Sequence, residues 1–290
     1  MTRAEISIAL HGGSGAKPGH DYGSVTRHMR GLIELGQERL QRGIPAVEVA
    51  VEIVAALESS GLYIAGRGAS PNLDGDYELD ACVMDGSSGS AGAVAALTGF
   101  ANPIRAAAAV MRKTPHVLLV GSGAAQFARQ QRLEATPAHS AWYTNACSFE
   151  AVPAAESHGT VGCVTRDVRG NLAAATSTGG AFGKLPGRVG DSALIGASTW
   201  ADRNLAVSCT GHGEAFIRAA AAAQVAHRVR FGAQTLEAAA TAVIEEIAAQ
   251  GGHGGLIAID SSGNVTMPFR SSGMKRAALL NDGTILSLAP

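Results

Sequence analysis

The stretch GTVGCVT, residues 159–165, decides how this 290-residue chain is interpreted. Residues 161–165 form a short apolar run that predicts a buried strand. The residues before it, 134–159, are mostly small or polar and show no sustained period. Long stretches without periodicity are uncommon inside a compact domain and are often functional. We therefore expect a flexible linker that ends on the Gly159–Thr160 bond, at the mouth of the strand.

Cleavage of the Gly159–Thr160 bond would change the chemistry of Thr160, because this residue would then carry a free α-amine. Such an amine has an unperturbed pKa of about 7.7–8.0, so a useful fraction is neutral near neutral pH. The neutral amine can accept the proton of the residue's own hydroxyl, which is otherwise a weak nucleophile. Thr160 is therefore a candidate for both nucleophile and base.

A second segment, KLPGRVGDS at residues 184–192, places opposite charges close together in a Gly- and Pro-containing loop. Arg188 offers a planar cation that suits a carboxylate, and Asp191 offers an anion that suits an ammonium group. Together they would clamp the zwitterionic end of an amino acid. The alternative is a simple ion pair at the surface, and these residues by themselves leave both interpretations open.

The overall composition excludes several classes of protein. The chain has 23 Lys and Arg against 24 Asp and Glu, a net charge of −1, which argues against nucleic acid or a membrane as a partner. Hydrophobic residues make up 46% and charged residues 16%, so the chain can bury a large core and is not a disordered protein. The 37 glycines indicate many turns or close backbone approaches.

Cysteine usage and the apolar runs predict a cytoplasmic protein. Cys82, Cys147, Cys163 and Cys209 form no C-x-x-C pair, so we expect buried, reduced thiols rather than a disulfide scaffold or a zinc site. The first apolar run, residues 6–10, is too short for the core of a signal peptide. No run reaches the length of about 18 apolar residues that a membrane span needs.

Strand-like and helix-like segments follow one another in a mixed order. Strands are expected at 77–84 and 91–97, joined by a short turn, and helices arrive in pairs, the last of them at 214–230 and 235–249. A doubly wound parallel sheet would alternate strands and helices one for one. Antiparallel sheets covered by pairs of helices fit this order better.

The motifs together resemble one family, the N-terminal-nucleophile (Ntn) hydrolases of the plant-type L-asparaginase and isoaspartyl (β-aspartyl) peptidase type, which also include glycosylasparaginases. The resemblance runs through nearly the whole chain. It is carried by residues 10–13, 78–86, 91–94, 115–117, 159–162, 175–180, 187–192, 210–214, 254–257 and 268–269.

This resemblance implies an α+β fold, a four-layer αββα sandwich formed by residues 1–290 as one domain. It also implies an inactive precursor that cleaves itself between Gly159 and Thr160, into an α subunit of residues 1–159 and a β subunit of residues 160–290. The loop His11-Gly12-Gly13 would pack against the scissile bond and support this maturation. Family members resemble (αβ)₂ dimers, so a homodimer of the processed chain is expected.

The resemblance also implies how the catalytic residues would act. Thr160 would attack the side-chain amide of L-asparagine or the β-linked bond of an isoaspartyl dipeptide and release L-aspartate. Thr178 would orient its hydroxyl, and Thr210 and Gly211 would form the oxyanion hole that such chemistry needs. No cofactor is expected for catalysis.

Substrate binding would fall to Arg188 for the α-carboxylate and Asp191 for the α-ammonium, as the residues themselves suggest. The implied substrate site also contains the run Thr210-Gly211-His212-Gly213. A structural sodium ion, bound by main-chain carbonyls near Leu57–Ala65, is common in the family and is expected here.

Two positions depart from the family's pattern. Ile64 stands where an asparagine is usual, and Gly183 replaces a frequent asparagine before Lys184. The run 69–72 is closer to the glycosylasparaginase side of the family. The alternatives to an isoaspartyl peptidase are therefore a glycosylasparaginase-like amidase and a relative that binds aspartyl groups but never matures.

Overall fold

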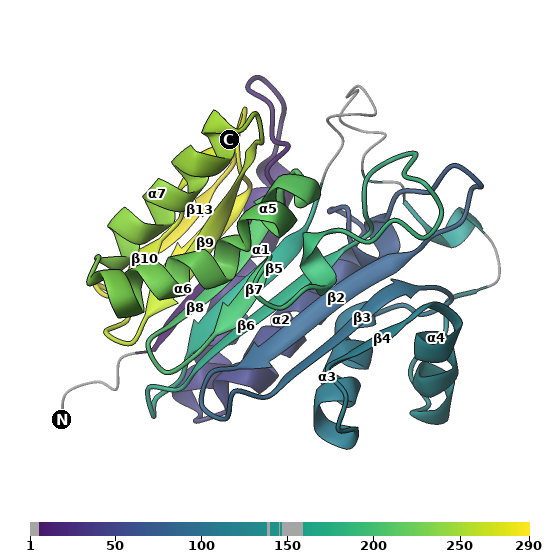
Figure 1. The fold of residues 1–290 in the computed structure, drawn as a ribbon, viewed down its shortest axis with the longest axis horizontal. Helices are drawn as coiled ribbons and strands as arrows, with labels where there is room; N and C mark the ends of the chain where they lie inside the picture. Colours follow the sequence, from purple (N-terminus) through teal and green to yellow (C-terminus); the bar gives the residue numbers. More distant parts are fainter. Residues whose placement is uncertain (1–5, 138–139, 145, 147–158) are drawn as a thin grey trace.

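The strands of the protein assemble into two sheets that lie face to face between two layers of helices, as the computed structural model shows (Figure 1). The structure describes residues 6–137, 140–144, 146 and 159–290. The predicted α+β class and the four-layer αββα sandwich are confirmed.

The larger sheet has eight strands in the order β13-β12-β1-β5-β6-β2-β3-β4. Its pairs are antiparallel, as expected, except for β3 with β4, which run parallel. The strands are β1 (Ser7–His11), β2 (Leu79–Asp85), β3 (Ala91–Leu97), β4 (Leu118–Val120), β5 (Val161–Arg166), β6 (Leu172–Thr178), β12 (Arg276–Leu279) and β13 (Ile285–Leu288).

The smaller sheet has the order β10-β9-β8-β7, with β11 also paired to β9. Small side chains fill much of the space between the two sheets, among them Ala9, Ala174, Ala206 and Ala278. Their size lets the sheets approach closely, which explains part of the chain's low aromatic content. The strands are β7 (Thr199–Ala201), β8 (Leu205–Gly211), β9 (Gly254–Asp260), β10 (Val265–Thr266) and β11 (Phe269–Arg270).

Each sheet carries helices on its outer face (Figure 1). The apolar faces of α1 and α2 bury residues such as Met29, Ile33 and Ile53 against the larger sheet. The helices of this layer are α1 (Gly23–Gln41), α2 (Ala46–Ser60), α3 (Pro103–Lys113) and α4 (Gly121–Gln130), and those of the other are α5 (Gly213–Ala219), α6 (Ala221–Gly232) and α7 (Leu236–Ala249).

The helix predicted over 214–230 is wrong in one respect, because α5 ends and α6 begins at Ala220. This residue has a left-handed backbone with φ of 47°. After the break, the N–H groups of Ala222 and Ala223 donate to the carbonyls of Ala197 and Gly196. The first turn of α6 is thus satisfied by a neighbouring loop rather than by the end of α5.

The register of the larger sheet brings three distant segments to one end of it. His11 in β1 lies opposite Gly162 in β5, and Thr178 in β6 lies opposite Asp80 in β2. Thr160, directly before β5, is therefore placed between the ends of β1 and β6. The fold itself assembles the region that the sequence analysis singled out.

Most of the predicted linker, residues 134–159, lies outside the described residues. Its described part contacts the body of the protein: the Tyr143 ring stacks on Tyr77 with 3.6 Å between centroids, and Thr144 Oγ1 donates to the Gly61 carbonyl at 2.7 Å. Among the described helices, none has the length and apolar character to cross a membrane.

Candidate active site

The Gly159–Thr160 bond is buried, and a side chain already contacts its carbonyl. Thr178 Oγ1 donates to the carbonyl oxygen of Gly159 at 2.5 Å. The N–H of Gly180 donates to the same Thr178 oxygen at 3.0 Å, which leaves the hydroxyl proton directed at Gly159. The family resemblance implies that Thr178 orients the hydroxyl of Thr160. In the uncut chain the Thr178 hydroxyl contacts the carbonyl of the bond that precedes this candidate nucleophile.

The loop of His11, Gly12 and Gly13 packs against this bond. Gly13 has φ of 102°, and a Cβ there would lie 3.4 Å from Gly159 Cα and 3.5 Å from the Thr160 nitrogen. A Cβ at Gly13 would make ordinary contact with this bond, but the positive φ would strain the backbone of any residue with a side chain. On the other side of the bond, the Ile64 side chain lies against Gly159.

His11 contacts the backbone of the candidate nucleophile directly. Its Nδ1 lies 3.0 Å from the carbonyl oxygen of Thr160, and the ring is fully buried. Burial lowers the pKa of His11 to about 3, although the contact with the Thr160 carbonyl opposes this shift. The imidazole is therefore neutral near neutral pH.

Arg188 and Asp191 lie in the same pocket as Thr160, so they are not a pair confined to the surface. Asp191 is only 3% exposed, and its Oδ2 has no hydrogen-bond partner among the described residues. Burial raises the pKa of this carboxyl to about 6. The pocket has about 10 Å³ of free volume, close to what one water molecule needs. Its lining consists of Gly159, Thr160, Thr178, Gly180, Arg188, Gly190, Asp191 and Gly211.

Glu214, a residue without a role in the sequence analysis, holds the guanidinium of Arg188. Arg188 Nε and Nη2 donate to the two Glu214 oxygens, both at 3.0 Å. This side-on pair lowers the pKa of Glu214 to about 2. Arg188 Nη1 has no hydrogen bond within the described part of the chain, so the end of the guanidinium remains available for a second carboxylate.

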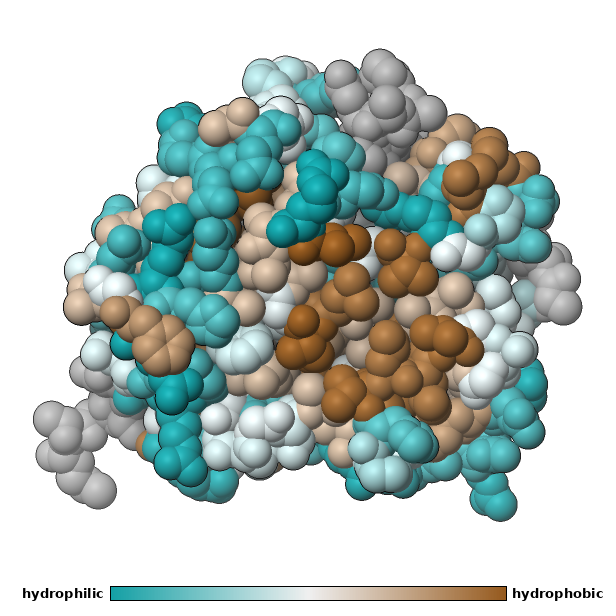
Figure 2. Space-filling view, in the orientation of Figure 1, coloured by the Kyte–Doolittle hydropathy of each residue, from teal (hydrophilic) through white to brown (hydrophobic). Residues whose placement is uncertain are grey.

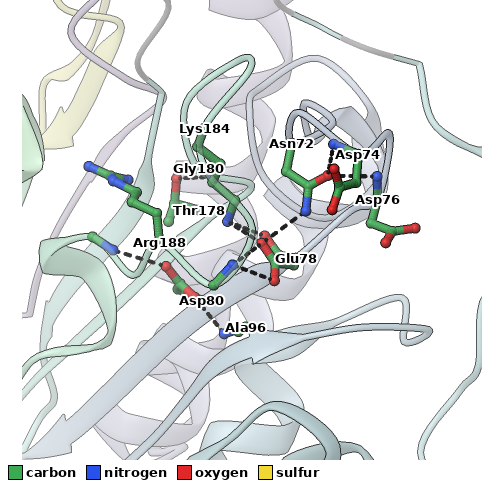
Figure 3. Close-up of polar contacts among 12 residues, drawn as sticks. Asn72, Asp74, Asp76, Glu78, Asp80, Ala96, Thr178, Gly180, Lys184 and Arg188 are labelled. Carbon is green, nitrogen blue, oxygen red and sulfur yellow. Dashed lines mark hydrogen bonds and ion pairs between the residues drawn. The ribbon is translucent and has the colours of Figure 1, made fainter.

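Charged side chains at the start of β2 hold the loop that carries Arg188 and Asp191 (Figure 3). The Glu78 carboxylate accepts the N–H of Gly187 at 2.9 and 3.1 Å, and Lys184 Nζ donates to the Glu78 carbonyl at 2.9 Å. These contacts connect Glu78 with Lys184 and Gly187. The Glu-Leu-Asp run of residues 78–80 was visible in the sequence, but nothing there indicated which loop it would meet.

Asp80 adds a second anchor deeper in the protein. Its Oδ1 accepts the Ala96 N–H at 2.8 Å, and its Oδ2 accepts the Gly190 N–H at 3.3 Å. Burial raises the pKa of Asp80, while the nearby charges of Lys184 and Arg188 oppose that shift. The carboxylate thus fixes the backbone between the two residues of the clamp.

The residues expected to form the oxyanion hole lie at the end of β8. Gly211 lines the pocket, and Thr210 is fully buried, with no hydrogen-bond partner for its Oγ1 among the described residues. Gly213 lies against Arg188 and Asp191. His212 is placed at the rim, outside the pocket lining, where its Nε2 lies 3.4 Å from Glu214 and its ring stacks on His253.

The segment expected to bind sodium, Leu57–Ala65, leaves α2 and turns through Gly61. Thr144 Oγ1 donates to the Gly61 carbonyl at 2.7 Å, and the Gly179 N–H donates to the Ile64 carbonyl at 2.8 Å. A carbonyl oxygen has two lone pairs, so each of these retains one for a cation. The neutral carbonyl oxygens of this turn suit a monovalent cation.

An αββα sandwich with a buried Gly–Thr bond directly before a central strand has the architecture of an Ntn hydrolase. Within that class the chain belongs to the asparaginase family: the family model described as Asparaginase matches residues 4–148 and 139–286. This result confirms the resemblance to plant-type asparaginases and isoaspartyl peptidases.

Similar proteins in bacteria and animals carry names from this family. The isoaspartyl peptidase of Salmonella typhimurium is 45% identical, over 93% of this chain and 94% of that protein. The isoaspartyl peptidase of Escherichia coli is 43% identical, over 93% and 91%. The isoaspartyl peptidase/L-asparaginase of Rattus norvegicus is 39% identical, over 96% and 89%.

Proposed function

We propose that the protein is an isoaspartyl peptidase with L-asparaginase activity, and that it becomes active by cutting its own Gly159–Thr160 bond. The observation that carries this proposal is the hydrogen bond of Thr178 to the Gly159 carbonyl, in a pocket that also contains Arg188 and Asp191. The names of its relatives support the same activity.

Maturation starts with attack of Thr160 Oγ on the carbonyl carbon of Gly159. The hydrogen bond from Thr178 stabilises the charge that develops on the carbonyl oxygen. The C–N bond then breaks, the nitrogen takes up a proton, and the acyl group is left as an ester on the Thr160 oxygen. Water hydrolyses this ester, which gives a new carboxyl group at Gly159 and a free amine at Thr160.

Turnover uses the same oxygen on a different carbonyl. The free amine of Thr160 accepts the hydroxyl proton, and Oγ attacks the β-carbonyl of the substrate. Thr210 Oγ1 and the N–H of Gly211 donate to the oxyanion. The amine or ammonia leaves with the proton, water hydrolyses the acyl-enzyme, and L-aspartate is released.

Substrate recognition depends on two fixed charges. The free end of the Arg188 guanidinium binds the α-carboxylate while Glu214 holds its side. Asp191 binds the α-ammonium, which supplies the partner that its buried Oδ2 lacks among the described residues. Because Gly159 lines the uncut pocket, release of this residue opens the space for the substrate.

The direct test is hydrolysis of β-Asp-Leu and of L-asparagine by the wild-type protein and by Thr160→Ala. We expect both activities in the wild type and neither in the variant.

An N-glycosylated asparagine in the same assay tests the alternative of a glycosylasparaginase, which would prefer that substrate. Binding of L-aspartate by a chain that stays uncut would favour the non-maturing alternative, for which Ile64 beside Gly159 is the supporting observation.

We further propose that the processed chain forms an (αβ)₂ dimer through the exposed edge of the larger sheet at β4. Apolar side chains gather on this part of the surface (Figure 2). Val117, Leu118 and Val120, in and beside the edge strand β4, are 50%, 38% and 56% exposed. A contiguous apolar face of this kind suits a second copy of the same chain. Light scattering should give a dimer, and Leu118→Glu should give a monomer.

We also propose a cytoplasmic location, because the buried thiols of Cys82, Cys163 and Cys209 are free, which suits a reducing compartment.

We propose, in addition, a structural sodium ion on the carbonyls of Leu57–Ala65, in the turn after α2. The midpoint of thermal unfolding should rise when sodium replaces a large organic cation in the buffer. No catalytic step involves this ion.

A further inference from the structure

A row of buried hydroxyl groups continues from the His11 ring into the space between the two sheets. His11 Nε2 lies 2.9 Å from Ser208 Oγ, which lies 2.8 Å from Thr176 Oγ1. Thr199 Oγ1 donates to Thr176 Oγ1 at 2.6 Å. All four residues are fully buried. With the contact from His11 Nδ1 to the Thr160 carbonyl, the row ends on the candidate nucleophile.

Both sheets contribute to this row, and the strand register explains how they meet. His11, Gly162 and Thr176 lie opposite one another on three neighbouring strands of the larger sheet. Ser208 and Thr199 lie opposite one another on β8 and β7 of the smaller sheet. A Cβ at Gly162 would lie 2.0 Å from Ser208 Oγ and 2.4 Å from His11 Nε2. Because Gly162 has no side chain, Ser208 of the smaller sheet can contact His11.

The Thr160 carbonyl fixes the direction of every hydrogen bond in the row. A carbonyl only accepts, so a neutral His11 ring must carry its proton on Nδ1. Nε2 must then accept from Ser208, and Ser208 in turn must accept from Thr176. Thr176 accepts from Thr199, which agrees with the direction of that contact. A protonated His11 would donate from both nitrogens and would reverse the row, but burial keeps this ring neutral.

We propose that Ser208, Thr176 and Thr199 are positioning residues, which hold His11 in the Nδ1–H tautomer so that its ring fixes the carbonyl of Thr160. The proposal rests on the proposed function in one respect, the role of Thr160 as nucleophile. Cleavage removes the covalent tether on the amino side of Thr160. The hydrogen bond from His11 remains as a constraint on the backbone of this residue, and it helps to keep the hydroxyl and the amine in position for attack.

The tautomer can be measured without any assay of activity. In NMR spectra of the full chain labelled with ¹⁵N-histidine, the His11 ring should show a protonated Nδ1 and an unprotonated Nε2. The spectrum of His11→Gln identifies the signal. Thr176→Val should weaken the preference, because Ser208 then lacks the donor that orients it. A protonated Nε2, or a doubly protonated ring, near neutral pH in the wild type would overturn the inference.

Kinetics test whether the row positions the nucleophile. Thr176→Val keeps the shape of the side chain but removes its hydroxyl, and it should slow both self-cleavage and kcat by roughly ten- to hundredfold. KM should stay within about twofold of the wild-type value, because Arg188 and Asp191 are untouched. Thr176→Ser keeps the hydroxyl and should restore both rates.

Ser7→Ala is the matched control, since it removes a buried hydroxyl outside the row, in β1, which among the described residues donates to the Gly263 carbonyl. It should leave both rates unchanged. Equal losses in Thr176→Val and Ser7→Ala, or no rescue by Thr176→Ser, would contradict a positioning role. If the wild type is inactive on both substrates, the proposed function fails, whereas an active wild type with the other tautomer refutes only this inference.

Discussion

At the scale of single residues, Glu214 holds the guanidinium of Arg188 in place. We therefore expect a substitution of Arg188 to weaken substrate binding more than a substitution of Glu214. Arg188→Ala leaves self-cleavage intact but removes the partner of the substrate α-carboxylate. We expect kcat/KM to fall by the equivalent of about 2–5 kcal/mol, mostly through KM. Glu214→Gln should raise KM by a smaller factor, because the guanidinium keeps its charge and loses only its orientation. An unchanged KM in Arg188→Ala would refute the clamp.

Asp191 should make substrate binding sensitive to acid. Burial raises its pKa to about 6, and only the ionised carboxylate attracts the α-ammonium group. Binding is therefore retained above this pKa and lost as the pH falls through it. The inhibition constant of L-aspartate should rise about tenfold for each pH unit below about 6. A constant that stays flat down to about pH 4 would contradict this role.

The charges of the clamp were predictable from the sequence, because Arg188 and Asp191 are three positions apart in one loop. Glu214 was not, since it follows a different strand and meets Arg188 only in the folded chain. The hydrogen bond of Thr178 to Gly159 was not predictable either. It belongs to the uncut state, whereas the family resemblance describes the processed enzyme.

At the scale of elements, the start of β2 and the loop of residues 184–192 depend on each other. Asp80→Asn removes a buried negative charge that faces Lys184 and Arg188, and it weakens the acceptor of the Gly190 N–H. We expect a higher KM and a free energy of unfolding lower by about 2–4 kcal/mol. Denaturant titration and kinetics measure the two effects. Asp85→Asn, at the half-buried far end of the same strand, is the control for the kinetic effect and should leave KM unchanged.

Most element types followed from periodicity, but their ends did not, and residues 194–197, which have the pattern of a strand, form a turn before β7. The break at Ala220 inside an alanine-rich run carries no sequence signal, because only the loop at 196–197 makes it favourable. The hairpin of β12 and β13 was not predicted either. Its strands have four residues each and gain their stability by extending a sheet whose other strands lie far away in the sequence.

At the scale of the whole molecule, the two expected fragments are interleaved within one sheet. In the order β13-β12-β1-β5-β6-β2-β3-β4, strands before and after residue 160 alternate in blocks, with β1 between β12 and β5. After cleavage the fragments should therefore stay together in native buffer and separate only in denaturant. Separation on a native sizing column would contradict this arrangement.

The layered architecture followed from the family resemblance, while the patterns alone indicated antiparallel sheets covered by helix pairs. The interleaving of the two fragments in the larger sheet could not be predicted from the sequence. Strand order depends on pairing between distant segments, whereas the spacing of apolar residues reports only on local structure. The glycine excess is explained in part at this scale. Gly162 lies where Ser208 and His11 approach too closely for a side chain, and Gly13 has a positive φ that favours glycine.

The central claim is that Thr160 becomes the nucleophile by release from Gly159. Intact mass measurement of the purified wild-type chain in denaturant tests it most directly, combined with sequencing of the new amino terminus. Two fragments of 159 and 131 residues are expected (290 − 159 = 131), the second beginning with Thr160. A chain that stays at 290 residues and still hydrolyses β-Asp-Leu, or a cut at any other bond, would contradict it.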